Sequence, residues 1–291
     1  MDKSSQRDLF SPIVGNDGLM GPFLLIARLM TASVFVLYIS NLLRGGSIVE
    51  RPGMPAGVLY FFLAIQFIGV AMVIVGYGTR VAALLMAAFC IATTVLFTGS
   101  TGWSGMFMTH MLKDLAVAAG FLFLFAQGAG PLSVDGMSSR VETMGSGRAA
   151  DVLLLAGRVM AAVLFFYYGR YKIMNTAAMQ AYMIKHNSHV PPELIYLAIL
   201  TQIVPPLLMV LGYKTRYAAL ALSGFCLIAT ALFHADFGNP AEVEQVLLDV
   251  SIAGGLLFLF AHGPGGLSLD ARQGKTLSAG RTAEALSAKG L

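Results

Sequence analysis

The sequence predicts an all-α integral membrane protein whose eight transmembrane helices form two parallel, tandem four-helix bundles. The composition supports this fold class, because 57% of the 291 residues are hydrophobic and only 12% are charged, where soluble domains carry about 25% charge. Apolar stretches of about 20 residues, the length that spans a bilayer as a helix, recur along the whole chain. A third observation, an internal repeat, divides these stretches into two sets of four.

The repeat is visible in two motifs that return in the same order. VGYGTR at 75–80 returns as LGYKTR at 211–216, an offset of 212 − 76 = 136 residues. FLFAQG at 123–128 returns as FLFAHG at 258–263, an offset of 258 − 123 = 135. A period of this length is too long for a solenoid unit. It predicts a duplicated membrane module, one copy at 21–136 and the other at 151–272.

In the first module we expect transmembrane helices at 22–43, 57–76, 80–98 and 108–127. Each range is long enough to cross a hydrocarbon core of about 30 Å. Gly76 can cap the second helix, and the third begins after the short turn that follows. Gly128 ends the fourth helix, because a proline comes shortly after it and cannot continue the helix.

In the second module the expected helices are 152–171, 191–212, 216–234 and 244–262. Two prolines at 191–192 can open the second helix of this module, and Gly212 can cap it. The pair Pro205-Pro206 lies inside that helix and is expected to kink it. Gly263, followed directly by a proline, ends the last helix.

The remaining segments are a polar N-terminal segment at 1–20, a linker at 137–150 and a tail at 273–291. An even number of crossings places all three on one face of the membrane. That face carries eleven Lys and Arg residues against six on the opposite face, so both termini are predicted to be cytoplasmic. The two modules then insert in parallel, related by an approximate twofold axis along the membrane normal.

Composition also restricts the partners. The 19 basic residues exceed the 15 acidic ones but are scattered, which fits contact with membrane lipids and argues against nucleic acid. Cys90 and Cys226 occupy equivalent apolar positions and are expected to be buried core residues without a disulfide. His186 and His189 lie in a predicted loop at 173–190 without an acidic neighbour, so no metal site is predicted.

Several landmarks of the second module follow one another in a recognisable order: Gly157-Arg158, YGRYK at 168–172, LGYKTR, ATALFH at 229–234, and GGLL at 254–257 before GPG at 263–265. With them, residues 151–272 resemble the DoxX family of four-helix bacterial membrane proteins, and 21–136 resemble a more diverged copy. The resemblance implies a helical bundle in the bacterial cytoplasmic (inner) membrane. The family includes a subunit resembling that of thiosulfate:quinone oxidoreductase, which implies a place beside membrane redox complexes.

Charges within the predicted spans identify the first candidate residues. Arg28 and Asp114 match Arg158 and Asp249 in the second module. Charges inside a membrane usually pair or face a cavity, so each arginine is expected to pair with the aspartate of its own module, linking first and fourth helices. The helix rise leaves an axial gap of roughly 10 Å, which water or Gln66 and Gln202 can bridge. The pairs are interpreted as structural clamps, with a headgroup or quinone pocket as the alternative.

Two further ionisable residues occur only in the second module. Lys172 and His234 correspond to Leu42 and Thr98 in the first. They are expected to face one vestibule at the outer end of the bundle, where a histidine can exchange protons near neutral pH and a lysine can stabilise negative charge. Interfacial anchoring by lysine and tyrosine is the alternative. The predicted ligand-binding residues are Lys172, His234, Arg158, Asp249, Gln202 and Tyr168.

Together with these residues, the resemblance implies a DoxX-like accessory or quinone-interacting subunit of a membrane redox system. The alternative is a non-catalytic scaffold that binds partner subunits or lipids, and a transporter is a third, weaker hypothesis because the ionisable groups gather near one face. No catalytic residue is assigned. No cofactor is evident from the sequence, and quinone is the one candidate.

Overall fold

The computed structural model describes residues 17–43, 56–101, 105–138, 147–187, 189–234 and 236–273. The regular secondary structure of these residues is entirely helical, with turns and bends between the helices. The helices are α2 (Asp17–Leu43), α3 (Ala56–Val75), α4 (Thr79–Thr101), α5 (Gly105–Gln127), α6 (Val134–Met137), α7 (Arg148–Met174), α8 (Thr176–His186), α9 (Leu194–Leu211), α10 (Thr215–Phe233) and α11 (Pro240–His262). Most of the predicted N-terminal segment, linker and tail lies outside the described residues.

Each of the eight predicted ranges contains one long helix, which confirms the all-helical fold class. Six of the described helices are long and apolar enough to cross a membrane, namely Gly18–Leu37, Met108–Gln127, Arg148–Met174, Leu194–Leu211, Thr215–Phe233 and Pro240–His262. In α3 and α4 the qualifying apolar stretches are shorter, at Leu63–Val75 and Thr79–Val95. The chain is therefore a multi-pass helical membrane protein, and the full number of eight crossings stays a prediction.

One predicted loop is largely helical. The range 173–190 was expected to be a hairpin loop, but α7 continues to Met174 and α8 occupies most of the rest. Asn175 separates the two helices, and its backbone N–H donates to the carbonyl of Tyr171. The prediction of a loop was wrong because the segment mixes apolar and polar residues in a short run, which periodicity assigns poorly.

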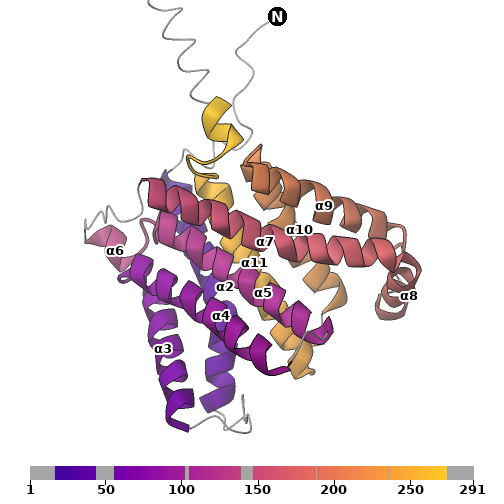
Figure 1. The fold of residues 1–291 in the computed structure, drawn as a ribbon, viewed down its shortest axis with the longest axis horizontal. Coiled ribbons are helices and arrows are strands. Elements are labelled where there is room, and N and C mark those ends of the chain that lie inside the picture. Colours follow the sequence, from indigo (N-terminus) through magenta and orange to yellow (C-terminus); the bar gives the residue numbers. More distant parts are fainter. Residues whose placement is uncertain are drawn as a thin grey trace, which may run out of the picture.

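The two repeats interlock instead of forming separate closed bundles. The first helix of each repeat packs mainly on the fourth helix of the other: α2 lies along α11, and α7 lies along α5. First and fourth helices of the same repeat make few contacts. The pattern of contacts stays the same when each helix is replaced by its equivalent in the other repeat, as expected for a duplicated module. Figure 1 shows α5, α7 and α11 in the middle, with α3 at one side and α9 and α10 at the other.

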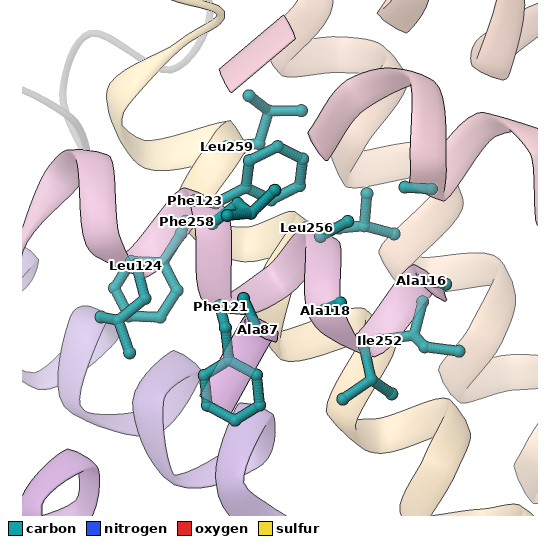
Figure 2. Close-up of a cluster of buried hydrophobic side chains, with 14 of the residues drawn as sticks. Ala87, Ala116, Ala118, Phe121, Phe123, Leu124, Ile252, Leu256, Phe258 and Leu259 are labelled. Carbon is teal, nitrogen blue, oxygen red and sulfur yellow. The ribbon is translucent and has the colours of Figure 1, made fainter. Parts of the chain in front are cut away.

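The centre of this arrangement is a close crossing of α5 and α11. A Cβ atom added to Gly255 would lie 2.4 Å from the Cα atom of Gly120, and 255 − 120 = 135 makes these two glycines equivalent positions of the repeat. Small residues allow helix backbones in a membrane to approach this closely. Around the crossing, buried side chains of both helices form a joint apolar core, with Phe121 and Phe123 on α5 and Phe258 on α11 (Figure 2).

In each repeat, an aspartate that follows the fourth helix holds the turn before the third helix, which carries the motif VGYGTR or LGYKTR. Asp270 accepts hydrogen bonds from the backbone N–H groups of Lys214 (2.8 Å) and Thr215 (3.0 Å), which begin α10. Asp135 does the same for Gly78 and Thr79, both at 2.8 Å. Burial raises the pKa of Asp135, but the bonds from Thr79 and Gly78 and the charge of Arg28 outweigh it and leave the pKa below its usual value.

The predicted helix caps are confirmed. Gly76 has φ +76° and Gly212 has φ +68°, a left-handed conformation that side chains other than glycine rarely adopt. The N–H of Gly212 donates to the carbonyl of Met209, and that of Gly76 to the carbonyl of Met72. Cys90 and Cys226 are buried and free, also as predicted.

Candidate functional site

A cavity of about 740 Å³ opens within the second repeat, among α7, α8, α9, α10 and α11. Its volume lies in the range that small-molecule sites occupy. The wall is mainly apolar, with residues such as Leu164, Phe165 and Phe225. The polar and charged side chains that reach it are Lys113, Tyr168, Tyr171, Lys172, Tyr182, Thr201, Gln202, His234, Gln245 and Asp249. Five of the six predicted ligand-binding residues therefore surround one cavity, and Arg158 does not.

Lys172 and Gln202 form the first polar contact of the cavity. Lys172 lies in the last turn of α7, and its Nζ donates to Oε1 of Gln202 on α9 at 2.8 Å. The same ammonium group lies 5.5 Å from the ring centroid of Tyr168, within the range of a cation–π contact. Gln202 is 4% exposed. The ammonium group of Lys172 is thus held by a buried amide and an aromatic face.

Asp249 on α11 forms the second polar group. Its Oδ2 accepts hydrogen bonds from Oγ1 of Thr230 at 2.8 Å and from Nε2 of Gln245 at 3.0 Å. Gln245 in turn accepts through Oε1 from Nζ of Lys113. Within the part of the chain that the structure describes, both hydrogen bonds to the carboxylate end on Oδ2, which leaves Oδ1 to a ligand.

Lys113 was not among the predicted site residues. It lies on α5, in the first repeat, so the polar network of this cavity crosses the boundary between the repeats. Its equivalent at offset 135 is Leu248. The criterion that identified Lys172 and His234, an ionisable residue present in one repeat only, would also have identified Lys113.

His234 contacts an acidic residue, Glu242, that was not among the predicted site residues. Its Nδ1 is 2.5 Å from Oε2 of Glu242, and the two side chains are 24% and 29% exposed. This pair sits where α10 ends and α11 has just begun. His234 thus lines the cavity where α10 meets the start of α11.

The predicted ion pairs between arginine and aspartate are not formed. Arg28 donates from Nη1 to the carbonyl of Ala129 at 3.0 Å and from Nη2 to that of Leu132 at 2.8 Å. Asp114 instead accepts from Oγ1 of Thr94 at 3.4 Å. The prediction was wrong because it assumed that first and fourth helices of one repeat pack together, whereas each first helix packs on the other repeat.

Arg158 repeats this arrangement in the second half. Its Nη1 donates to the carbonyl of Met209 at 3.3 Å and its Nη2 to that of Leu267 at 2.5 Å. The side chain is 0% exposed. It joins the end of α9 to the segment after α11. Arg158 is therefore a structural residue that holds the segment after α11 against the end of α9. It does not line the cavity, so its predicted role in ligand binding has no geometric support.

Helix α8 covers one end of the cavity. Met179, Tyr182 and Met183 of this helix line the wall. The ring of Tyr182 stacks on that of His186 with centroids 3.8 Å apart. The helix is followed by Asn187, whose Nδ2 donates to the carbonyl of Leu232 on α10 at 3.1 Å. The cavity is thus lined at this end by an element that the sequence analysis had assigned to a loop.

Comparison with known proteins gives matches in both repeats. Residues 23–99 and 153–235 match the family model described as DoxX. The inner membrane protein YqjF of Escherichia coli (strain K12) is 34% identical over 120 residues, which is 41% of this chain and 91% of that protein. The inner membrane protein YphA of the same strain is 30% identical over 131 residues, 43% of this chain and 94% of its own length.

A eukaryotic protein aligns with a longer part of the chain. The Surfeit locus protein 4 homolog of Drosophila melanogaster is 25% identical over 222 residues, 72% of this chain and 71% of that protein. No solved structure matches the chain. The two bacterial relatives are aligned over most of their own length and less than half of this chain, as expected where one chain carries two copies of their module.

Proposed function

The chain belongs to the DoxX family of membrane proteins, and we propose that the cavity of its second repeat binds a quinone as part of a membrane redox system. The observation that carries this proposal is the combination of a large apolar cavity with Lys172 and Asp249 at its polar end. In this role the protein is an accessory, quinone-interacting subunit that works beside other subunits.

The polar end suits the two oxygens of a quinone ring. Lys172 has three N–H donors and gives one to Gln202, so donors remain for a ligand carbonyl. An ammonium group also stabilises negative charge that develops on that oxygen. Oδ1 of Asp249 can accept from a hydroxyl group of the reduced form. The apolar wall accommodates the ring.

Replacing Lys172 with methionine tests the site directly. Because a hydrogen bond from a charged donor contributes about 1.5–3 kcal/mol, we expect quinone affinity to fall by about tenfold or more. The measurement is equilibrium binding of decyl-ubiquinone to purified protein in lipid nanodiscs. Lys185→Met is the matched control, since Lys185 is exposed on α8 and does not line the cavity.

Equal affinities of Lys172→Met and Lys185→Met would count against the quinone site. The alternative, a scaffold for partner subunits or lipids, would then gain support. That alternative predicts tolerance of changes inside the cavity and sensitivity on the exposed apolar face of α9, where Leu200 and Leu207 are 57% and 49% exposed and do not line the cavity.

We further propose that the protein lies in the inner membrane with both termini in the cytoplasm. The names of the two bacterial relatives support the location, and the excess of Lys and Arg on the terminal face supports the orientation. Fusions at residue 142 and after Leu291 are expected to give fluorescent GFP and inactive alkaline phosphatase. Active alkaline phosphatase at either point would show that this point lies outside the cytoplasm and would contradict the proposed orientation.

A further inference from the structure

We propose that the ligand reaches this cavity sideways from the bilayer, between α9 and α10, and that its hydrocarbon chain lies in that gap. The inference rests on the proposed quinone site and adds the class of ligand: a lipid-soluble quinone with a tail, as opposed to a water-soluble one. Three features of the second repeat lead to it.

The first feature is that the cavity wall continues onto the lipid-facing surface. Leu197 on α9 and Ile228 on α10 both line the cavity, yet they are 58% and 61% exposed. Gln202 and Cys226 line the same cavity and are 4% and 6% exposed. Both helices are apolar enough to span a membrane, so their exposed apolar side chains face lipid. The cavity therefore runs from a buried polar end to a lipid-facing opening.

The second feature is an empty position in the middle of α10. Gly224 lines the cavity, and a Cβ atom added there would have no atom within 4 Å. The gap between α9 and α10 is thus open at the level of Gly224.

The third feature is the separation of polar and apolar groups along α10. Leu220 lines the cavity, and Thr230 donates a hydrogen bond to Asp249, which also lines it. Leu220 and Thr230 are 230 − 220 = 10 residues apart. At 1.5 Å per residue this distance is about 15 Å. The polar groups gather at the Thr230 end, and the wall at the Leu220 end is apolar. A molecule with a polar head and an alkyl or isoprenoid tail matches this gradient.

The test compares a tailed and a tail-less ligand in variants that fill the gap. Gly224→Phe places a ring where no atom stands, and Ala221→Phe, also on the wall, is a second blocking variant. Gly224→Ala is the size control. Ala88→Phe is the matched control, because Ala88 is the equivalent of Gly224 at offset 136 and is exposed in the first repeat.

We expect both blocking variants to weaken decyl-ubiquinone binding about tenfold, because a ring in the gap displaces the tail and the loss of about two buried methylene groups accounts for such a change. Binding of the tail-less dimethoxy-methyl-benzoquinone should be unchanged, which also shows that the variants are folded. Gly224→Ala and Ala88→Phe should bind both probes like the wild type.

Each other outcome decides against one of the two proposals. If neither blocking variant separates the two probes, access between α9 and α10 is refuted while the quinone site stands. If Gly224→Phe loses both probes, Ala221→Phe decides by the same criterion. If the wild-type protein binds neither probe, the quinone site itself is refuted, and the lateral access with it.

Discussion

Replacement of Arg158 by methionine is expected to lower the free energy of unfolding by about 3–5 kcal/mol. The side chain is fully buried and donates to the carbonyls of Met209 and Leu267. Each hydrogen bond from a charged donor contributes about 1.5–3 kcal/mol, and a buried carbonyl left without a donor adds a desolvation penalty. Methionine fills similar space but donates nothing, so the carbonyl of Leu267 loses this donor and that of Met209 keeps the N–H of Gly212 alone.

The measurement is denaturant unfolding of the purified protein in detergent micelles, followed by circular dichroism. Arg170→Met is the control, because Arg170 lies on the same helix and is exposed. Arg28→Met should resemble Arg158→Met, since Arg28 donates to Ala129 and Leu132 in the same way. If Arg158→Met unfolds at the same midpoint as Arg170→Met, the buried arginine does not hold the loop.

Two pairs of residues that recur in both repeats serve the fold. Asp135 and Asp270 cap the third helix of each repeat, and Arg28 and Arg158 hold the adjoining loops. Recurrence alone does not indicate a structural role, because Gln202 and Asp249 also recur and line the cavity. The sequence predicted the positions of the long helices well, because runs of apolar residues ended by glycine and proline mark them directly.

The contacts between helices were less predictable. Four-helix modules suggested closed bundles, in which Arg158 would face Asp249. Which helix packs on which is decided by small residues that let backbones approach, such as Gly254, whose Cβ position lies 2.6 Å from the backbone N of Thr31 on α2. Hydrophobic periodicity carries no information on this choice, because α2, α5, α7 and α11 are apolar on most sides.

The candidate site was predicted in part. Residues present in one repeat only, Lys172 and His234, led to the cavity, and Gln202, Asp249 and Tyr168 line it as well. Lys113 was missed because it belongs to the first repeat, and only the interlocked arrangement brings it to Gln245. Arg158 was included because its charge was assigned a partner in the membrane, whereas its two Nη groups donate to backbone carbonyls.

Replacement of Gly255 by leucine is expected to disrupt the contact between the two repeats. A Cβ on Gly255 would lie 2.4 Å from Gly120 Cα, and a backbone atom cannot rotate away as a side chain can. The helices α5 and α11 must therefore separate, which costs more than the roughly 3 kcal/mol at the upper end of ordinary overpacking. The shared core of Phe121, Phe123 and Phe258 would lose contacts with it.

Unfolding of Gly255→Leu is compared with that of Gly57→Leu, because Gly57 lies on α3 and a Cβ there meets no atom within 4 Å. The variant should also bind decyl-ubiquinone more weakly, since separating α5 from α11 moves Lys113 away from Gln245. A purely local defect would lower stability and leave this affinity unchanged. A Gly255→Leu protein with the stability and affinity of Gly57→Leu would mean that the glycine crossing is not what joins the repeats.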